Sequence, residues 1–200
     1  MSRIVIDTET TGLDPEKDEL LQLSIIDDEG NVLFNSLFRP ERTHTWDAAQ
    51  AVNGITPEMV MDAPNIADKK DEISRIVEQA EAIVGYNTMF DIIFLTNNDI
   101  HLPADHSFDV VDVMRDFAPI YGEWSEKKRD YKWQKLTKAA EYYGYDWESH
   151  PEGAHNSLGD CYATLHVYKS IKKEKQATPK KEQEPGLTSK RKYSKVKKGR

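Results

Sequence analysis

Short apolar runs separated by polar turns make up the first part of the chain. Runs at residues 4–6, 20–26 and 32–38 have the length and residue types of β-strands. The segment between the second and third runs, residues 27–31, reads Asp-Asp-Glu-Gly-Asn and is typical of a hairpin connection. The pattern therefore predicts three antiparallel N-terminal strands.

A helical period replaces the strand pattern further along the chain. Apolar residues recur three and four positions apart in three segments, each predicted to form an amphipathic helix: Ile73–Ala80, Trp133–Tyr143 with Gly144 as its end, and Leu158–Tyr168. Two short strands, at 82–86 and 108–111, and a helix at 88–98 lie between them. Antiparallel strands followed by alternating strands and helices predict an α/β fold with a mixed central sheet flanked by helices.

Charge divides the chain into two parts. The 200 residues carry a net charge of −8. Residues 176–200 hold nine Lys and Arg against two Glu, a net of +7, which leaves −15 on residues 1–175. Because the last segment also lacks an apolar period, we predict a folded acidic domain at 1–175 and a basic, disordered tail at 176–200. The tail is either a tether for nucleic acid or a solubilising charge run.

Several classes of protein do not fit this composition. No apolar run approaches the length that spans a bilayer, and the first residues lack the apolar stretch of a signal peptide. Cys161 is the only cysteine, so neither an intramolecular disulfide nor a cysteine-based zinc site can form. We therefore expect a cytoplasmic protein that does not contact membranes.

Two carboxylates follow the first apolar run. Side chains two positions apart on a strand point to the same face, so Asp7 and Glu9 project together at the end of a buried strand. Two anions held in this way repel each other and lose hydration, and a divalent cation removes both penalties. From this pair alone, a metal site and a pair of solvated acids are equally good interpretations.

A third carboxylate, Asp91, follows the predicted strand at 82–86. Asn87 or Thr88 is suited to cap a helix that begins here, and an acid in the first turn of that helix is favourable. Helix capping therefore explains Asp91 by itself. It does not explain why a second strand end also delivers a carboxylate.

The fourth carboxylate comes with a histidine at the start of the last predicted helix. Residues 155–160 read His-Asn-Ser-Leu-Gly-Asp, in which Ser157 and Asp160 have the spacing of a capping box and His155 would be a loop residue. Together, however, four acids and a histidine at such junctions are what two-metal phosphodiester hydrolysis requires. Oxygen ligands suit Mg²⁺ or Mn²⁺, and a histidine can take a proton from the attacking water near neutral pH.

The same segments resemble the motifs of a known family. Asp7–Leu13, which reads Asp-Thr-Glu-Thr-Thr-Gly-Leu, resembles the first exonuclease motif of the DnaQ-like superfamily. Asn87-x-x-Phe90-Asp91 resembles the second motif, and His155-x-x-x-x-Asp160 resembles the third in its histidine (DEDDh) form. Val52–Thr56, with Asn53 where relatives often have His, and the stretch around Lys135 and Leu136 resemble further family segments. The resemblance covers residues 4–170 and the motifs stand in the family order.

The resemblance implies an RNase H-like fold and a metal-dependent 3′→5′ exonuclease with two Mg²⁺ or Mn²⁺ ions. It implies that Asp7 bridges both ions, that Glu9 and Asp160 hold the ion that binds the attacking water, and that Asp91 supports the second ion, largely through water. His155 would be the general base. Substrate-binding positions are implied at Thr8, Thr10, Gly12, Leu13, Asn87 and Phe90, with Leu13 packing on the terminal base. The alternative for Leu13 and Phe90 is an ordinary place in the core.

Two departures from the family pattern leave the substrate open. Tyr86 stands where many relatives have His, and the third motif reads His-Asn-Ser rather than His-Arg-Ala, which removes a positive charge near the scissile phosphate. A DNA exonuclease such as a proofreading subunit and an RNA-trimming exonuclease share the five catalytic residues. The first motif most resembles polymerase III epsilon-type chains, which favours single-stranded DNA or DNA 3′ ends as substrate. A DNA polymerase would then be the partner, although no polymerase-binding segment is recognisable.

Two other classes of function compete with the exonuclease. The first is a catalytically silent nucleic-acid-binding scaffold on the same fold, and the retention of all five catalytic residues argues against it. The second is a small-molecule phosphodiesterase that uses the same metals. Elsewhere, Trp133 and Cys161 fall on apolar stripes and are expected in the core, whereas Trp124 and Trp147 lie among charged residues and receive no assignment.

Overall fold

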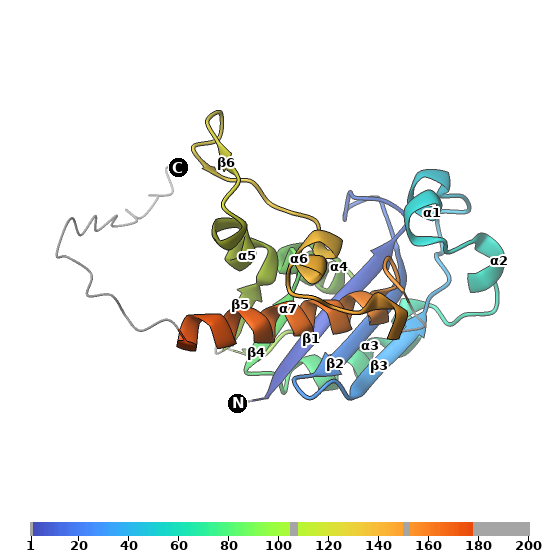
Figure 1. The fold of residues 1–200 in the computed structure, drawn as a ribbon. Coiled ribbons are helices and arrows are strands. Elements are labelled where there is room, and N and C mark those ends of the chain that lie inside the picture. Colours follow the sequence, from blue (N-terminus) through green and yellow to red (C-terminus); the bar gives the residue numbers. More distant parts are fainter. Residues whose placement is uncertain (1, 105–107, 150–152, 178–200) are drawn as a thin grey trace, which may run out of the picture.

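A five-stranded mixed sheet forms the centre of the computed structural model, which describes residues 2–104, 108–149 and 153–177 (Figure 1). The strand order is β3–β2–β1–β4–β5. The first three strands pair antiparallel, whereas β4 runs parallel to β1 and β5 runs parallel to β4. The predicted mixed α/β sheet is thus confirmed. The strands are β1 (Arg3–Thr10), β2 (Leu20–Asp27), β3 (Val32–Leu37), β4 (Ala82–Gly85) and β5 (Asp109–Asp112).

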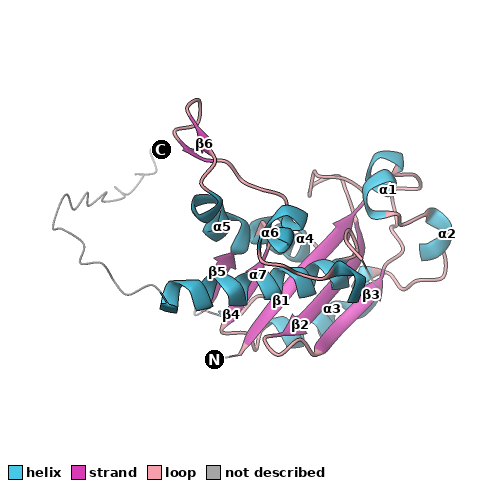
Figure 2. Ribbon diagram, viewed as in Figure 1, coloured by secondary structure: helices cyan, strands magenta, loops and turns pink. Residues whose placement is uncertain are grey.

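Helices cover both faces of the sheet. The helices α3 and α4 share one apolar core with the sheet, and α5, α6 and α7 share the other. In Figure 2, α7 crosses in front of the strands and α3 lies behind them. The helices are α1 (Asp47–Asn53), α2 (Pro57–Val60), α3 (Ile66–Val77), α4 (Thr88–Asn97), α5 (Val113–Tyr121), α6 (Leu136–Tyr142) and α7 (Ser157–Ala177), with a 3₁₀ turn at Trp147–Ser149 and a small hairpin of β6 (Trp124–Ser125) and β7 (Asp130–Tyr131).

The alternation of side chains along β1 determines on which face of the sheet each polar residue near its end lies. Ile4 and Ile6 are buried in the core under α3 and α4, and Val5 is buried in the core under α5, α6 and α7. Because successive side chains alternate between faces, Asp7 and Glu9 continue on the side of Val5. Thr8, between them, continues on the side of Ile6. The central strand therefore delivers polar groups to both faces at once.

The predicted hairpin connection between β2 and β3 is confirmed. Oδ1 of Asp27 accepts hydrogen bonds from the backbone N–H groups of Glu29, at 2.9 Å, and Asn31, at 2.8 Å. Gly30 adopts a φ of +94°, which a residue with a side chain rarely takes. The turn thus closes through an aspartate side chain and a glycine, as its sequence predicted.

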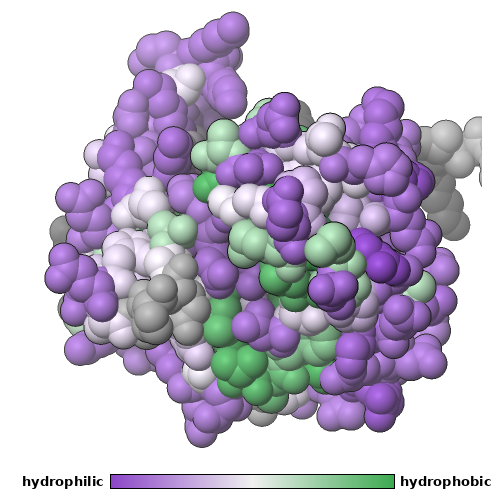
Figure 3. All heavy atoms as spheres, turned by 90° about the vertical axis from the view of Figure 1, so that its right-hand side faces the viewer, coloured by the Kyte–Doolittle hydropathy of each residue, from purple (hydrophilic) through white to green (hydrophobic). Residues whose placement is uncertain are grey.

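A third, smaller core attaches α1 and α2 to the sheet. Leu21 of β2 packs with Trp46, Ile55 and Val60, and Nε1 of Trp46 donates a hydrogen bond of 2.7 Å to the carbonyl oxygen of Ile55. Figure 3 looks at the side of the molecule on which α1 and α2 lie in Figure 1. Apolar surface gathers there in one area bordered by hydrophilic side chains.

Some elements differ from the predictions. Trp133 is 59% exposed, so its expected place in the core was wrong. The helix begins only at Leu136, because Lys135 is its extended N-cap residue, with a ψ of 153°. The helices α1, α2 and α5 and the β6–β7 hairpin were not predicted. Cys161, in contrast, is buried as expected.

The predicted tail at 176–200 lies almost entirely outside the described residues. Only Gln176 and Ala177 are described, and both still belong to α7. The boundary at residue 175 therefore stays a prediction. Within the described ranges, no helix is both long and apolar enough to cross a membrane.

Candidate active site

Three carboxylates from two elements meet at the end of β1. One oxygen each of Asp7, Glu9 and Asp160 lies within 4.8 Å of the other two, and all three side chains are half-buried. Asp7 and Glu9 share the face of β1 that α7 covers, and Asp160 lies in the first turn of α7. The structure thus brings together residues that are more than 150 positions apart in the sequence.

Buried polar residues of β2 hold the start of α7 against the sheet. The hydroxyls of Ser24 and Ser157 are 2.6 Å apart, and the backbone N–H of Ser157 donates to Oε1 of Gln22 at 3.2 Å. In the strand pairing, Ser24 lies opposite Asp7 and Gln22 lies opposite Glu9. The strand neighbours of the two acids therefore position the helix that carries the third acid.

Sequence reasoning did not find this support. The available signal was the occurrence of two polar residues, Gln22 and Ser24, at alternate positions of an otherwise apolar strand. Both are buried, and a buried polar group needs a hydrogen-bond partner. Such a pair on one strand face indicates a polar contact from a covering element.

The helix start also differs from the predicted capping box. Asn156, rather than Ser157, accepts a hydrogen bond from the backbone N–H of Leu158, at 3.1 Å. Oδ1 of Asp160 accepts from the backbone N–H of His155, at 3.4 Å. His155 has a φ of +62° and is exposed. The cap therefore lies at Asn156, one residue before the predicted position, and Asp160 holds the backbone of His155.

Asp91 reaches the same region from the opposite face of the sheet. It lies in the first turn of α4 and is only 3% exposed. The hydroxyl of Thr8 donates a hydrogen bond of 2.7 Å to its Oδ1. Asp91 is not one of the three carboxylates that lie within 4.8 Å of one another. A fourth acid therefore stands beside the cluster, held by the residue between Asp7 and Glu9.

A tight turn between β4 and α4 places Asp91. A Cβ at Gly85 would come within 3.1 Å of the backbone of Thr88, so only glycine fits there without a shift. Asn87 adopts a φ of +71°, which asparagine tolerates better than most residues. The hydroxyl of Thr88 donates to the carbonyl oxygen of Val111 at 2.7 Å and ties the turn to β5.

The four acids repel one another in a region that water reaches poorly. Burial is the largest cause that raises their pKa values: to about 8 for Glu9, about 7 for Asp91 and about 6 for Asp160, and well above the ordinary range for Asp7. The neighbouring carboxylate of Asp160 adds to the rise at Asp7 and Glu9, while His155 lowers the pKa of Asp160. A bound cation would relieve this repulsion.

The donor set fits a hard divalent cation. Asp7, Glu9 and Asp160 offer carboxylate oxygens close enough to share one ion, and Asp91 supplies a further carboxylate nearby. No cysteine takes part, since the buried Cys161 packs in the core. Oxygen-only ligands of this kind suit Mg²⁺ or Mn²⁺ better than softer metals.

In the loop after β1, the backbone at Gly12 lies very close to the side chain of Asp18. A Cβ at Gly12 would overlap the carboxylate of Asp18, which accepts a hydrogen bond of 2.8 Å from the backbone N–H of Asp14. Thr10 is buried, and its hydroxyl donates to the carbonyl oxygen of Gly12. Leu13, at the tip, is 83% exposed, so it is not a core residue. The loop that follows β1 thus presents an apolar side chain to solvent.

Other residues of the family motifs border the site. Asn87 is exposed, whereas Phe90 is half-buried and packs against Phe94 with ring centroids 4.9 Å apart. The side chain of Asn53, at the end of α1, lies near Glu9 and lowers the pKa of that carboxyl. Its Nδ2 also donates to the carbonyl oxygen of Thr10 at 3.4 Å.

An acidic cluster that can bind metal, built on this fold, defines a hydrolase of the nuclease class. A sequence model of the family described as exonuclease, of the RNase T type, matches residues 4–168. The chain belongs to the DnaQ-like exonuclease family.

Curated relatives support the same family. The chain is 33% identical over 178 residues to the uncharacterized exonuclease CP81 of Escherichia phage 186, covering 86% of this chain and 88% of that protein. It is 31% identical to a DNA polymerase III subunit epsilon-like protein of Rhodobacter capsulatus, covering 82% of this chain and 23% of that protein. It is 29% identical to RNA exonuclease 4 of Candida glabrata, covering 86% of this chain and 60% of that protein. The chain thus spans most of the phage protein but under two thirds of the other two.

Solved structures confirm the predicted RNase H-like fold. Exonuclease I of Escherichia coli, in complex with a dT13 oligonucleotide, superimposes with a TM-score of 0.71 at 22% identity, covering 88% of this chain and 42% of that one. Exonuclease X, in complex with 5′ overhanging duplex DNA, superimposes with a TM-score of 0.64 at 21% identity, covering 88% of this chain and 94% of that one.

Proposed function

We propose that the chain is a 3′→5′ exonuclease that hydrolyses phosphodiester bonds at the 3′ end of nucleic acid and releases nucleoside monophosphates. The observation that carries the proposal is the meeting of Asp7, Glu9 and Asp160 within 4.8 Å, on an exonuclease-family fold. The tethered Asp91 and the exposed His155 complete the set of five residues. The expected cofactors are two Mg²⁺ or Mn²⁺ ions.

Each acid has a distinct role in the proposal. Asp7 would contribute to holding both ions, Glu9 and Asp160 would hold the ion that activates the attacking water, and Asp91 would support the second ion, largely through water. When bound, the ions neutralise the negative charge of the phosphate and of the attacking and leaving oxygens. The raised pKa values favour this arrangement, because ionising the four acids without a counter-charge is costly.

His155 acts as the general base. Its imidazole takes a proton from the attacking water through a ring nitrogen, a task that a neutral imidazole can perform. The adjacent Asp160 carboxylate stabilises the imidazolium that results. The exposed position lets His155 pass that proton to solvent after each cleavage.

The residues around the acids position the terminal nucleotide. The exposed Leu13 packs on the terminal base, with Thr10 and Gly12 shaping its loop. Asn87 and Phe90 line the entry for the penultimate nucleotide, at the start of α4. Thr8, which faces Asp91, contributes by orienting that carboxylate.

DNA is the favoured substrate and RNA the alternative. The proposal of DNA is supported by the resemblance of the first motif to polymerase III epsilon-type chains and by relatives that carry that name. A relative named RNA exonuclease 4 supports the alternative. If the chain proofreads, a DNA polymerase is its partner. A catalytically silent scaffold is disfavoured because all five residues are present.

The decisive experiment uses single-stranded DNA and RNA of the same sequence, labelled at the 5′ end. The purified chain is incubated with Mg²⁺, Mn²⁺ or EDTA, beside an Asp7→Ala variant. A ladder that shortens from the 3′ end, requires metal and is absent in the variant is the expected result, and it identifies the preferred sugar. A folded wild-type protein that cleaves neither strand would contradict the proposal and favour a binding scaffold or a small-molecule substrate.

A further inference from the structure

The β6–β7 hairpin carries exposed aromatic rings that no core explains. Trp133 is 59% exposed, Trp124 46% and Tyr131 37%. Trp124 and Tyr131 are paired across the two strands, with ring centroids 5.3 Å apart and planes at 82°. All three belong to the exposed large apolar side chains of the described residues, with Trp133 near the upper end of that group and Tyr131 at its lower end. We call residues 124–135 the aromatic hairpin.

The aromatic hairpin is also basic within an acidic domain. It holds five Lys and Arg against two acids, whereas residues 1–175 carry −15 in total. Within the described ranges, Lys127, Lys128 and Arg129 form no ion pair, and the Lys128 ammonium lies 5.8 Å from the ring centre of Trp133. Basic side chains interleaved with exposed rings are what a single nucleic-acid strand requires, since phosphates need cations and bases need flat apolar surfaces.

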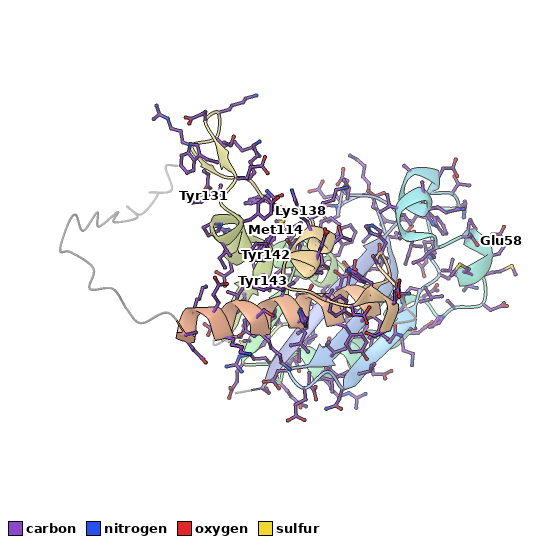
Figure 4. The ribbon with its side chains drawn as sticks, viewed as in Figure 1. Glu58, Met114, Tyr131, Lys138, Tyr142 and Tyr143 are labelled. Atoms are coloured by element: carbon purple, nitrogen blue, oxygen red, sulfur yellow. The ribbon has the colours of Figure 1, made fainter. Side chains whose placement is uncertain are left out.

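A surface hollow of about 400 Å³ lies on the hairpin itself. Charged groups and rings line it together: Ser125, Lys128, Asp130, Tyr131, Lys132 and Trp133. Figure 1 shows the hairpin projecting from the body of the molecule, and Figure 4 labels Tyr131 on it.

A chain of hydrogen bonds fixes the base of the hairpin to the active site. The hydroxyl of Tyr86 donates to the carbonyl oxygen of Gln134 at 2.9 Å, and Tyr86 directly precedes Asn87 at the start of α4. Nζ of Lys138 donates to Oε1 of Gln134 at 3.0 Å. The buried Gln134 thus links the hairpin to the turn that places Asp91.

We infer that the aromatic hairpin binds the single-stranded part of the substrate upstream of the 3′ end, by stacking bases on Trp133 and the Trp124–Tyr131 pair and by neutralising phosphates with Lys127 and Lys128. This inference rests on the proposed function and adds a second contact region to it. An acidic protein partner could use both the charges and the rings. Nucleic acid is favoured because Tyr86 and Gln134 tie the hairpin to the turn that places Asp91.

The first test compares a long strand with a substrate that occupies only the catalytic centre. The full-length chain and its Trp133→Ala and Trp133→Phe variants are assayed on a single strand of about 20 nucleotides and on p-nitrophenyl thymidine 5′-phosphate. We expect the KM for the long strand to rise about tenfold in Trp133→Ala, with most of the effect restored by Phe. The KM for the small ester should be unchanged in both variants.

The second test measures the charge contribution by binding, without relying on catalysis. Fluorescence anisotropy of a labelled strand is recorded across a salt series in an Asp7→Asn background, so that the strand stays intact. The variant Lys127→Ala/Lys128→Ala should flatten the slope of log Kd against log salt concentration by about 1.4. The matched control Lys169→Ala/Lys173→Ala, on exposed positions of α7, should leave the slope unchanged. DNA and RNA strands of one sequence are tested in parallel.

The outcomes separate this inference from the proposed function. A wild-type enzyme that degrades the strand while both hairpin variants keep its KM and salt slope would overturn the inference alone. Strand binding that depends on the hairpin, without hydrolysis of any substrate, would overturn the proposed function and leave the inference standing.

Discussion

The Thr8 hydroxyl donates a hydrogen bond of 2.7 Å to Oδ1 of Asp91 and so joins β1 to α4. Asp91 is 3% exposed, and this hydroxyl is a large part of what stabilises its ionised form. Thr8 stands between Asp7 and Glu9 in sequence but faces the other side of the sheet. One strand therefore both supplies two of the acids and orients a third.

Replacing Thr8 by Val should weaken the fold in a pH-dependent way. The bond lowers the pKa of Asp91, so its loss raises that pKa further above about 7. At pH 8 the ionised carboxylate would be buried without this donor, and we expect a loss of about 1–3 kcal/mol in unfolding free energy. At pH 5 the carboxyl is protonated and the loss should be smaller. Urea unfolding at both pH values measures the difference, and Thr8→Ser, which keeps the hydroxyl, should behave like wild type.

The acidic cluster should cost the metal-free protein stability as pH rises. Unfolded carboxyls titrate near 4, whereas Glu9 in the native state titrates near 8 and Asp91 near 7. Between about pH 4 and about pH 8 the native state binds more protons, so unfolding free energy falls with pH. Asp7→Asn removes one of the repelling charges and should raise Tm at pH 8 in EDTA by about 4–8 °C, equivalent to about 2 kcal/mol.

Metal binding should reverse the order of Tm that is expected in EDTA for the wild type and Asp7→Asn. Mg²⁺ that binds only the native state should raise the Tm of the wild type and do so less for Asp7→Asn. Asp62 is exposed and lies outside the cluster, so Asp62→Asn serves as the control. Its Tm should equal that of the wild type both in EDTA and with Mg²⁺. A wild-type Tm that rises with pH in EDTA would contradict this account of the cluster.

Gly12→Ala should disturb the loop beside the site through a single neighbour. The added Cβ would overlap the Asp18 carboxylate, which must move and release the backbone N–H of Asp14. We expect a loss of about 1–3 kcal/mol in stability together with reduced activity. In an Asp18→Ala background the same change should cost less, because the clash is absent. A double-mutant cycle from urea unfolding provides the coupling, and strict additivity would refute the steric explanation.

Leu13→Ala should separate binding from stability. The side chain is 83% exposed, so its loss should change unfolding free energy by less than about 0.5 kcal/mol. If it packs on the terminal base as proposed, the KM for a single strand should rise about tenfold. Steady-state kinetics beside thermal unfolding checks both statements. A destabilised protein with normal KM would show that the loop, rather than the base, needs this residue.

The fold could be predicted as far as local patterns specify it. Buried runs such as Ile4–Ile6 and the Asp27–Asn31 turn predicted strands and their connection, and both are present. The helix α5 was missed because it is short and contains Pro119, which normally argues against a helix interior. The prediction that Trp133 lies in the core was wrong because the apolar spacing extends to residues before Leu136, where the helix begins.

The acidic residues of the candidate site could be predicted from the sequence, whereas the residues that position them could not. The acids could be identified because carboxylates at strand and helix ends are costly without a cation. The polar positions Gln22 and Ser24 were visible in the sequence, but their partner Ser157 was not, because it lies more than 130 positions away and no local rule links them. The contact of Asn53 with Glu9 likewise depends on how the third small core places α1.

The two-sided burial of β1 has a consequence for how reliably the chain folds. Its apolar residues are sorted between two cores, so a slip of one position against β2 would turn Ile4 and Ile6 toward the wrong helices. The same slip would turn Asp7 and Glu9 away from Asp160 and toward the core under α4. A misregistered chain would therefore be destabilised both by lost packing and by buried charge. Molecules that fold at all should fold with an assembled site, and partly active, misaligned species should be rare even during refolding.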